Sequence, residues 1–128
     1  MKHYLTALVL AGGLAAAQAH AACDYPAKPG KFPDGNQASK DEMLAAKHSV
    51  EKYNGDIENY LKCLQDEYDA SVAAKPDATP AQKAELSKVH DQKHNAAVEE
   101  VTSVTESFNV QLRAWKAKAA ADKDKKTP

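Results

Sequence analysis

Two long stretches of this chain place apolar residues three and four positions apart. The first runs from Met43 to Leu64 and the second from Leu86 to Trp115. Spacing that alternates three and four puts side chains on one face of an α-helix. The chain shows no competing strand pattern and no obvious internal repeat. We therefore predict an all-α protein with two long helices, each with one apolar face.

The residues that we predict to form the core or an interaction surface all lie on these two apolar faces. They are Val50, Tyr53, Ile57, Tyr60, Leu64, Val101, Val104, Phe108 and Trp115. Such faces can fill the contact between the two helices, or part of them can bind another protein. The second interpretation predicts a homo-oligomer or a helical protein partner, and both interpretations stay open.

Capping motifs indicate where each helix begins. The sequence "SKDE" at 39–42 and the sequence "TPAQ" at 79–82 both match the capping box, and the second has proline at the first helical position. Pro76 should end the first helix. We predict helices over about 40–74 and 80–120.

The short connection between the helices predicts an antiparallel two-helix hairpin over residues 39–121. A turn near Asp77 would place Val50 opposite Val104. The alternative is a break of the first helix at "YNGD", 53–56, because a helical glycine costs about 1 kcal/mol. The charged segment 122–128 is predicted to be a disordered tail.

The N-terminus has the layout of a cleavable signal peptide. Lys2 precedes an apolar run at Leu5–Ala17, and small residues follow at Ala19 and Ala21. The run is shorter than the roughly 20 residues that cross a bilayer. We predict that residues 1–21 are removed, with cleavage after Ala19 as the alternative, and that the mature protein is periplasmic.

Cys23 and Cys63 are the only cysteines in the chain. An even count in an exported protein predicts a disulfide. The alternative is a lipid anchor on Cys23, although His20 stands where a lipoprotein signal usually has an aliphatic residue. A structural zinc site requires four ligands, so two cysteines alone do not predict one.

The segment 22–38 contains three prolines and a "PDG" turn signal, and we predict that it forms an extended arm. The helix from Ser39 to Cys63 would be about 36 Å long, and the arm could reach about 50 Å. The arm can therefore run back along the hairpin, where a disulfide would hold it. Tyr25 and Phe32 are either its anchors in the groove between the helices or solvent-facing side chains.

The sequence "HDQKH" places His90 and His94 one helical turn apart, a spacing that can bind a divalent metal. It lacks the HExxH pattern of zinc proteases. The hairpin would place His90 near Leu64, and no third ligand is evident. Two histidines on a helix flank are the competing interpretation, and no cofactor is predicted.

The remaining residues argue against several classes of function. The net charge is −1 with both signs interspersed, which does not suit nucleic acid binding. No nucleophile has an evident base, and a two-helix hairpin should have no cleft in which to shift a pKa, so we predict that the protein is not an enzyme. The first helix is too acidic to bind a membrane surface, whereas the more basic "RAWKAKAAADKDKK" at 113–126 keeps that interpretation open.

Four segments together resemble an uncharacterised family of small exported helical proteins of Gram-negative bacteria. They are "CDYPAKPGKFPDG", "DEMLAAKHSVEKYN", "YLKCL" and "ESFNVQLRAW". The resemblance implies export and a helical build, and it assigns no activity and no catalytic residue. We therefore expect a non-enzymatic protein with a structural or protein-interaction role in the cell envelope. The alternative is weak divalent-metal binding through His90 and His94.

Overall fold

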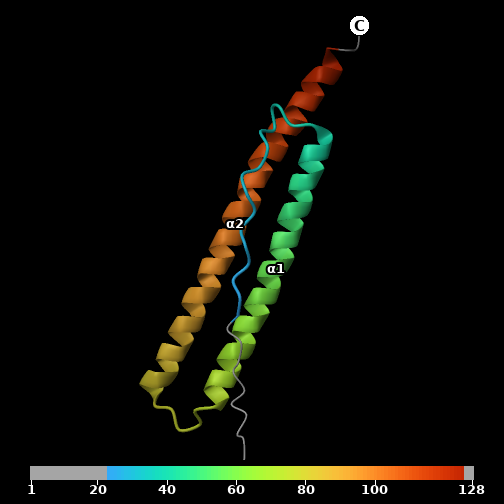
Figure 1. Cartoon of the computed structure of the whole chain (residues 1–128). Helices are drawn as coiled ribbons and strands as arrows, with labels where there is room; N and C mark the ends of the chain where they lie inside the picture. Colours follow the sequence, from blue (N-terminus) through green and yellow to red (C-terminus); the bar gives the residue numbers. More distant parts are fainter. Residues whose placement is uncertain (1–22, 126–128) are drawn as a thin grey trace, which may run out of the picture.

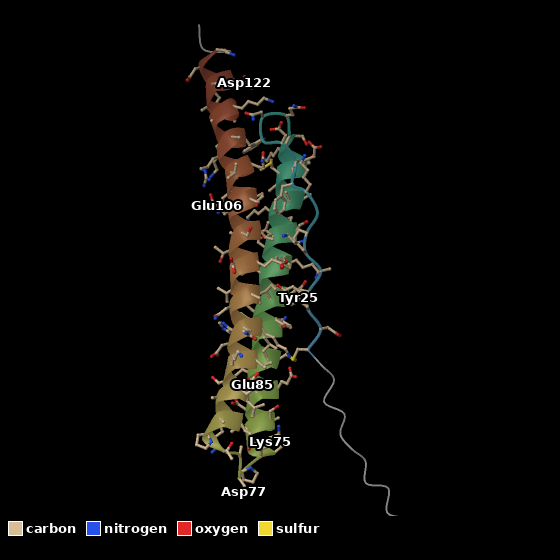
Figure 2. The ribbon with its side chains drawn as sticks, turned by 90° about the vertical axis from the view of Figure 1, so that its left-hand side faces the viewer. Tyr25, Lys75, Asp77, Glu85, Glu106 and Asp122 are labelled. Atoms are coloured by element: carbon tan, nitrogen blue, oxygen red, sulfur yellow. A yellow bond between two sulfur atoms is a disulfide. The ribbon has the colours of Figure 1, made fainter. Side chains whose placement is uncertain are left out.

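The computed structural model describes residues 23–125 as an extended arm followed by two helices (Figure 1). Helix α1 spans Lys40–Ala73 and helix α2 spans Pro80–Asp124. The two helices lie antiparallel, and the arm runs back along them (Figure 1). Figure 2 shows Asp77 at the turn and Asp122 at the opposite end. The predicted all-α hairpin with a disulfide-linked arm is confirmed.

Both helices begin with the capping boxes that the sequence predicts. The Glu42 N–H donates to Ser39 Oγ over 3.2 Å, and the Ser39 N–H donates to Glu42 Oε2 over 2.7 Å. The hydrogen bond from the Ser39 N–H, and then the one from the Ser39 hydroxyl to the same carboxylate, hold the pKa of the Glu42 carboxyl below its usual range. Thr79 and Gln82 form the same pair of contacts at the start of α2. Side chains therefore satisfy backbone donors at the beginning of each helix.

The helix ends differ from the predictions. Helix α1 ends at Ala73, one residue early, and α2 continues to Asp124. The prediction of a disordered tail from residue 122 is therefore wrong for residues 122–124. The sequence "AAADKD" at 119–124 contains strong helix formers and no glycine or proline, so the helix can continue. Residues 126–128, like the predicted signal peptide 1–21, lie outside the described residues.

Helix α1 runs without a break through Gly55, so the alternative with a break at "YNGD" is wrong. A Cβ atom at Gly55 would meet no atom within 4 Å. Glycine in a helix interior is less favourable than alanine.

Gly55→Ala should therefore stabilise the protein by roughly 0.5–1 kcal/mol. Urea unfolding followed by circular dichroism would measure this gain. A lower unfolding midpoint in the variant would show that α1 does not pass through this position as a regular helix.

The core lies between the helices in two clusters of buried side chains. The cluster nearer the turn contains Tyr53, Ile57, Tyr60, Leu64, Ala97 and Val104. The cluster nearer the free ends contains Met43, Ala46, Val50 and Phe108. Val104 and Val50, which we expected to lie opposite each other, are both buried but belong to different clusters.

Val101 and Trp115 are only partly buried, unlike the other predicted core residues. Helix α2 continues past the beginning of α1 (Figure 1). Trp115 packs against the cluster nearer the free ends, and its backbone lies beside Gly35 of the arm. Within residues 23–125, neither helix has the length and apolar character needed to cross a membrane.

Candidate functional site

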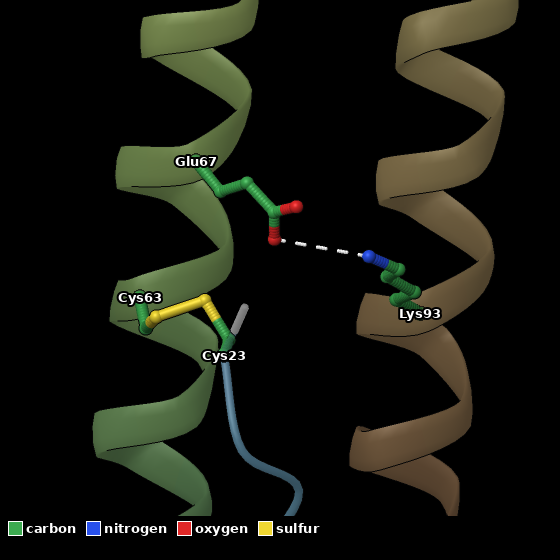
Figure 3. The surroundings of a disulfide bond; sticks show 4 residues. All are labelled: Cys23, Cys63, Glu67 and Lys93. Carbon is green, nitrogen blue, oxygen red and sulfur yellow. Dashed lines mark ion pairs between the residues drawn. A yellow bond between two sulfur atoms is a disulfide. The ribbon is translucent and has the colours of Figure 1, made fainter. Parts of the chain in front are cut away.

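The arm is held at its first described residue by the predicted disulfide. Cys23 and Cys63 are 40 residues apart in sequence, and their Cα atoms are 5.8 Å apart (Figure 3). A sulfur atom in a disulfide cannot also form the thioether of a lipid anchor. Cys23 can therefore form either the disulfide or the lipid anchor but not both, and in the structure it forms the disulfide.

Two aromatic side chains of the arm pack edge-on against aromatic rings of the helices. The ring centroids of Tyr25 and Tyr60 are 4.9 Å apart, and those of Phe32 and Phe108 are 5.6 Å apart. Edge-to-face contacts at such distances are favourable. The predicted anchoring role of Phe32 is confirmed, because it packs against both core clusters. Tyr25 contacts Tyr60 but remains 44% exposed, so it is both in contact with the helices and open to solvent.

A close backbone contact holds the far end of the arm. The Gly35 N–H donates to Gln111 Oε1 over 2.9 Å. A Cβ atom at Gly35 would lie 2.0 Å from the backbone oxygen of Gln111, so only glycine fits here. Asp34 shapes the turn by accepting the N–H of Asn36 with its carboxylate. The arm is thus fixed to α1 at one end and to α2 at the other.

A buried tyrosine connects the helices beside the arm. The hydroxyl of Tyr53 donates to Glu100 Oε1 over 2.7 Å. Burial first, and then this hydrogen bond, raise the pKa of Tyr53 well above its usual value. Tyr53 therefore stays neutral and links the helices. Sequence reasoning missed Glu100, because nothing in the sequence separates it from the other carboxylates of α2.

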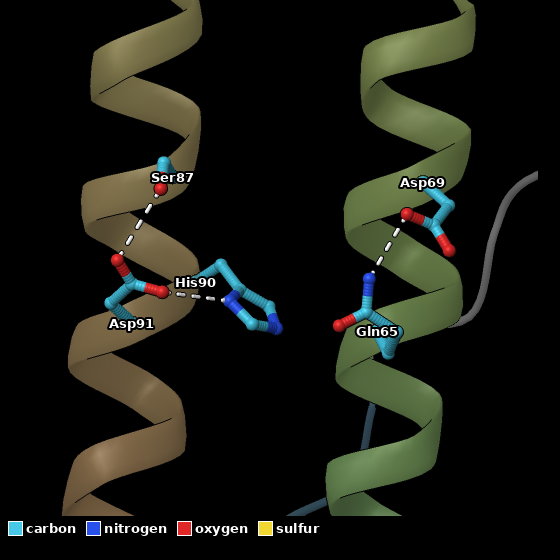
Figure 4. Close-up of polar contacts among 5 residues, drawn as sticks. All are labelled: Gln65, Asp69, Ser87, His90 and Asp91. Atoms are coloured by element: carbon cyan, nitrogen blue, oxygen red, sulfur yellow. Dashed lines mark hydrogen bonds and ion pairs between the residues drawn. The ribbon is translucent and has the colours of Figure 1, made fainter.

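The two histidines lie together on α2, as their spacing predicts. The ring centroids of His90 and His94 are 5.9 Å apart, and the His90 ring packs at 5.0 Å from that of Tyr68. The His90 side chain is 15% exposed, and its Nδ1 lies 3.1 Å from Asp91 Oδ1 (Figure 4). Its Nε2 is buried and has no hydrogen-bond partner among the described residues. No group of three His, Cys, Asp or Glu side chains in residues 23–125 could hold a metal ion.

A groove of about 300 Å³ lies between the helices on the turn side of the disulfide. We call it the open groove and define it by Leu64, Tyr68, Leu86, Val89 and His90. The sequence did not lead us to expect this groove. The arm fills the space between the helices only from Cys23 onward, so the part nearer the turn stays uncovered by the described chain. Leu64 and His90 both line the groove, as the predicted antiparallel register requires.

No protein-family model, curated protein or solved structure matches this chain. The resemblance to an uncharacterised exported family therefore stays a prediction.

Proposed function

We propose that this chain is an exported, non-enzymatic helical protein that binds another protein in the cell envelope. The observation that carries the proposal is the open groove, an apolar surface between two helices that the arm leaves uncovered. Val89 on its rim is 42% exposed. Exposed apolar surface of this kind is typical of interaction sites.

Export to the periplasm is part of the proposal. The signal-peptide layout of residues 1–21 supports it. The Cys23–Cys63 disulfide also supports it, because such bonds persist in oxidising compartments.

The titratable groups with shifted pKa values support a non-enzymatic role. Catalytic groups usually have perturbed pKa values in a cleft. Here the pKa values of Glu42 and Glu51 are lowered, by a helix cap and by a surface ion pair. The pKa values of Tyr25, Tyr53 and Tyr60 are raised, chiefly by burial where the arm packs on the helices. None of these five residues lines the open groove.

Photo-crosslinking in the native envelope tests the proposal. A benzophenone amino acid would replace Val89, Val98 or Val110, which are exposed valines at different positions along α2. We expect a discrete adduct with another protein from at least one position. Natively expressed protein that forms no adduct from any of the three would contradict the proposal.

The alternative function is weak divalent-metal binding by His90 and His94. One observation favours it: a carboxylate lies beside Nδ1 of His90 while Nε2 has no partner, an arrangement that orients metal-binding imidazoles. Two imidazoles alone make a poor and unselective site.

We expect an excess of zinc to leave the melting temperature unchanged. If the alternative is correct, zinc at ten times its Kd should stabilise the protein by about 1.4 kcal/mol. His94→Ala should then abolish that rise, whereas the control His48→Ala should keep it, because His48 is exposed on α1. Differential scanning calorimetry with and without zinc distinguishes the two results.

A further inference from the structure

We propose that the open groove binds an extended peptide segment of a partner protein, through an aromatic side chain of that segment. This inference rests on the proposed protein-binding function and specifies the chemistry of the partner. The arm of this chain shows how such a segment would bind.

The open groove continues the channel that the arm occupies. Glu67 and Lys93 line the groove, and their ion pair of 3.7 Å joins the two helices beside the disulfide (Figure 3). Lys93 stands two helical turns before Glu100 and therefore on the same face of α2. Glu100 in turn accepts the hydroxyl of Tyr53, which borders the arm. The groove and the arm thus lie along one face of the hairpin.

Aromatic rings follow one another along this face, and the arm covers them only in part. Phe108 is covered by Phe32, and Tyr60 is covered by Tyr25. The next ring towards the turn is Tyr68, which packs against His90 and against no aromatic side chain of the described arm. Tyr60 and Tyr68 are about 12 Å apart along α1, a distance that about four extended residues span. An extended segment can therefore place an aromatic ring at Tyr68 as the arm does at Tyr60.

The size and charge of the groove favour an extended segment over a helix or a strongly charged ligand. A volume of about 300 Å³ is at the lower end of the range for ligand-binding clefts, so the groove suits a single side chain rather than a large ligand. A helix is about 10 Å across and would need a longer surface. The rim carries both signs, with Glu67 and Glu85 beside Lys75 and Lys93, so it does not select a strongly charged partner. The apolar floor of Leu64 and Leu86 matches an aromatic or aliphatic anchor.

A peptide with the sequence of the arm is the probe. The acetylated and amidated peptide "DYPAKPGKFP", residues 24–33, would be added to the oxidised protein and followed by NMR. We expect shift changes at Tyr68, Leu86, Val89 and His90, with a millimolar or tighter dissociation constant. A peptide with alanine in place of its tyrosine and phenylalanine should lose these changes.

Two surface variants locate the binding. Val89→Glu puts a charge beside the apolar floor and should weaken binding by at least about tenfold. The control Val98→Glu changes a valine of similar exposure on the same helix, outside the groove, and should bind within about twofold of the parent. Both side chains are exposed, so both variants should fold, which circular dichroism checks.

Shift changes that are absent, that fall outside the groove, or that persist in Val89→Glu would overturn the inference. The protein could form crosslinks from Val98 or Val110 while the open groove binds no peptide. That combination would overturn the inference about the groove and would leave the proposed protein-binding function standing. The absence of crosslinks from every position would instead remove the proposed function on which it rests.

Discussion

Val104→Asp is expected to destabilise the protein by roughly 3–5 kcal/mol, because it buries a carboxylate with no partner. Val104 is 3% exposed and lies in the cluster of Tyr53, Ile57 and Leu64. Domains of this size are stable by only about 5–15 kcal/mol, so the loss removes a large fraction of the total stability. Urea unfolding followed by circular dichroism measures the loss.

The matched control is Val110→Asp. Val110 stands on the same helix and is 48% exposed, so its replacement should change stability by no more than about 0.5 kcal/mol. If both variants unfold at the same urea concentration, the assignment of the apolar faces to the contact between the helices is incorrect.

The second large effect should come from the disulfide. Removal of the Cys23–Cys63 bond should cost roughly 4 kcal/mol, because the bond closes a loop with a sequence separation of 40. The loss should also loosen the contact of Tyr25 with Tyr60. The melting temperature of the protein should therefore fall when a reducing agent is added.

The double variant Cys23→Ser, Cys63→Ser separates this effect from others of the reducing agent. Without the reducing agent, the double variant should melt at the same lowered temperature as the reduced parent protein. Addition of the reducing agent to the variant should produce no further change. A parent protein whose melting temperature is the same in both conditions would show that the arm is not held by this bond.

Local sequence signals account for the features that were predicted correctly. The capping boxes at Ser39 and Thr79 depend on residues three positions apart, and the apolar faces repeat every three or four positions. The disulfide followed from the presence of only two cysteines and from the reach of a proline-rich arm. Each of these inferences needs only a short stretch of sequence or a count.

The features that were missed depend on how distant segments meet. The open groove exists because the disulfide holds the start of the described arm at Cys63 rather than nearer the turn. The spacing of apolar residues in the sequence does not predict where along the helices the arm starts. The hydrogen bond from Tyr53 to Glu100 depends on the register of α1 against α2.

The arm of this protein is fixed to a helical hairpin by a disulfide, and we propose that the protein is exported. The intact mass of the protein, purified without reduction from cells that export it, tests this claim most directly. We predict the mass of a chain cleaved after Ala21, lower by two hydrogens because Cys23 and Cys63 are joined. Three results would contradict this account: a mass that includes residues 1–21, a mass that corresponds to two free thiols, or a mass increased by a diacylglyceryl group.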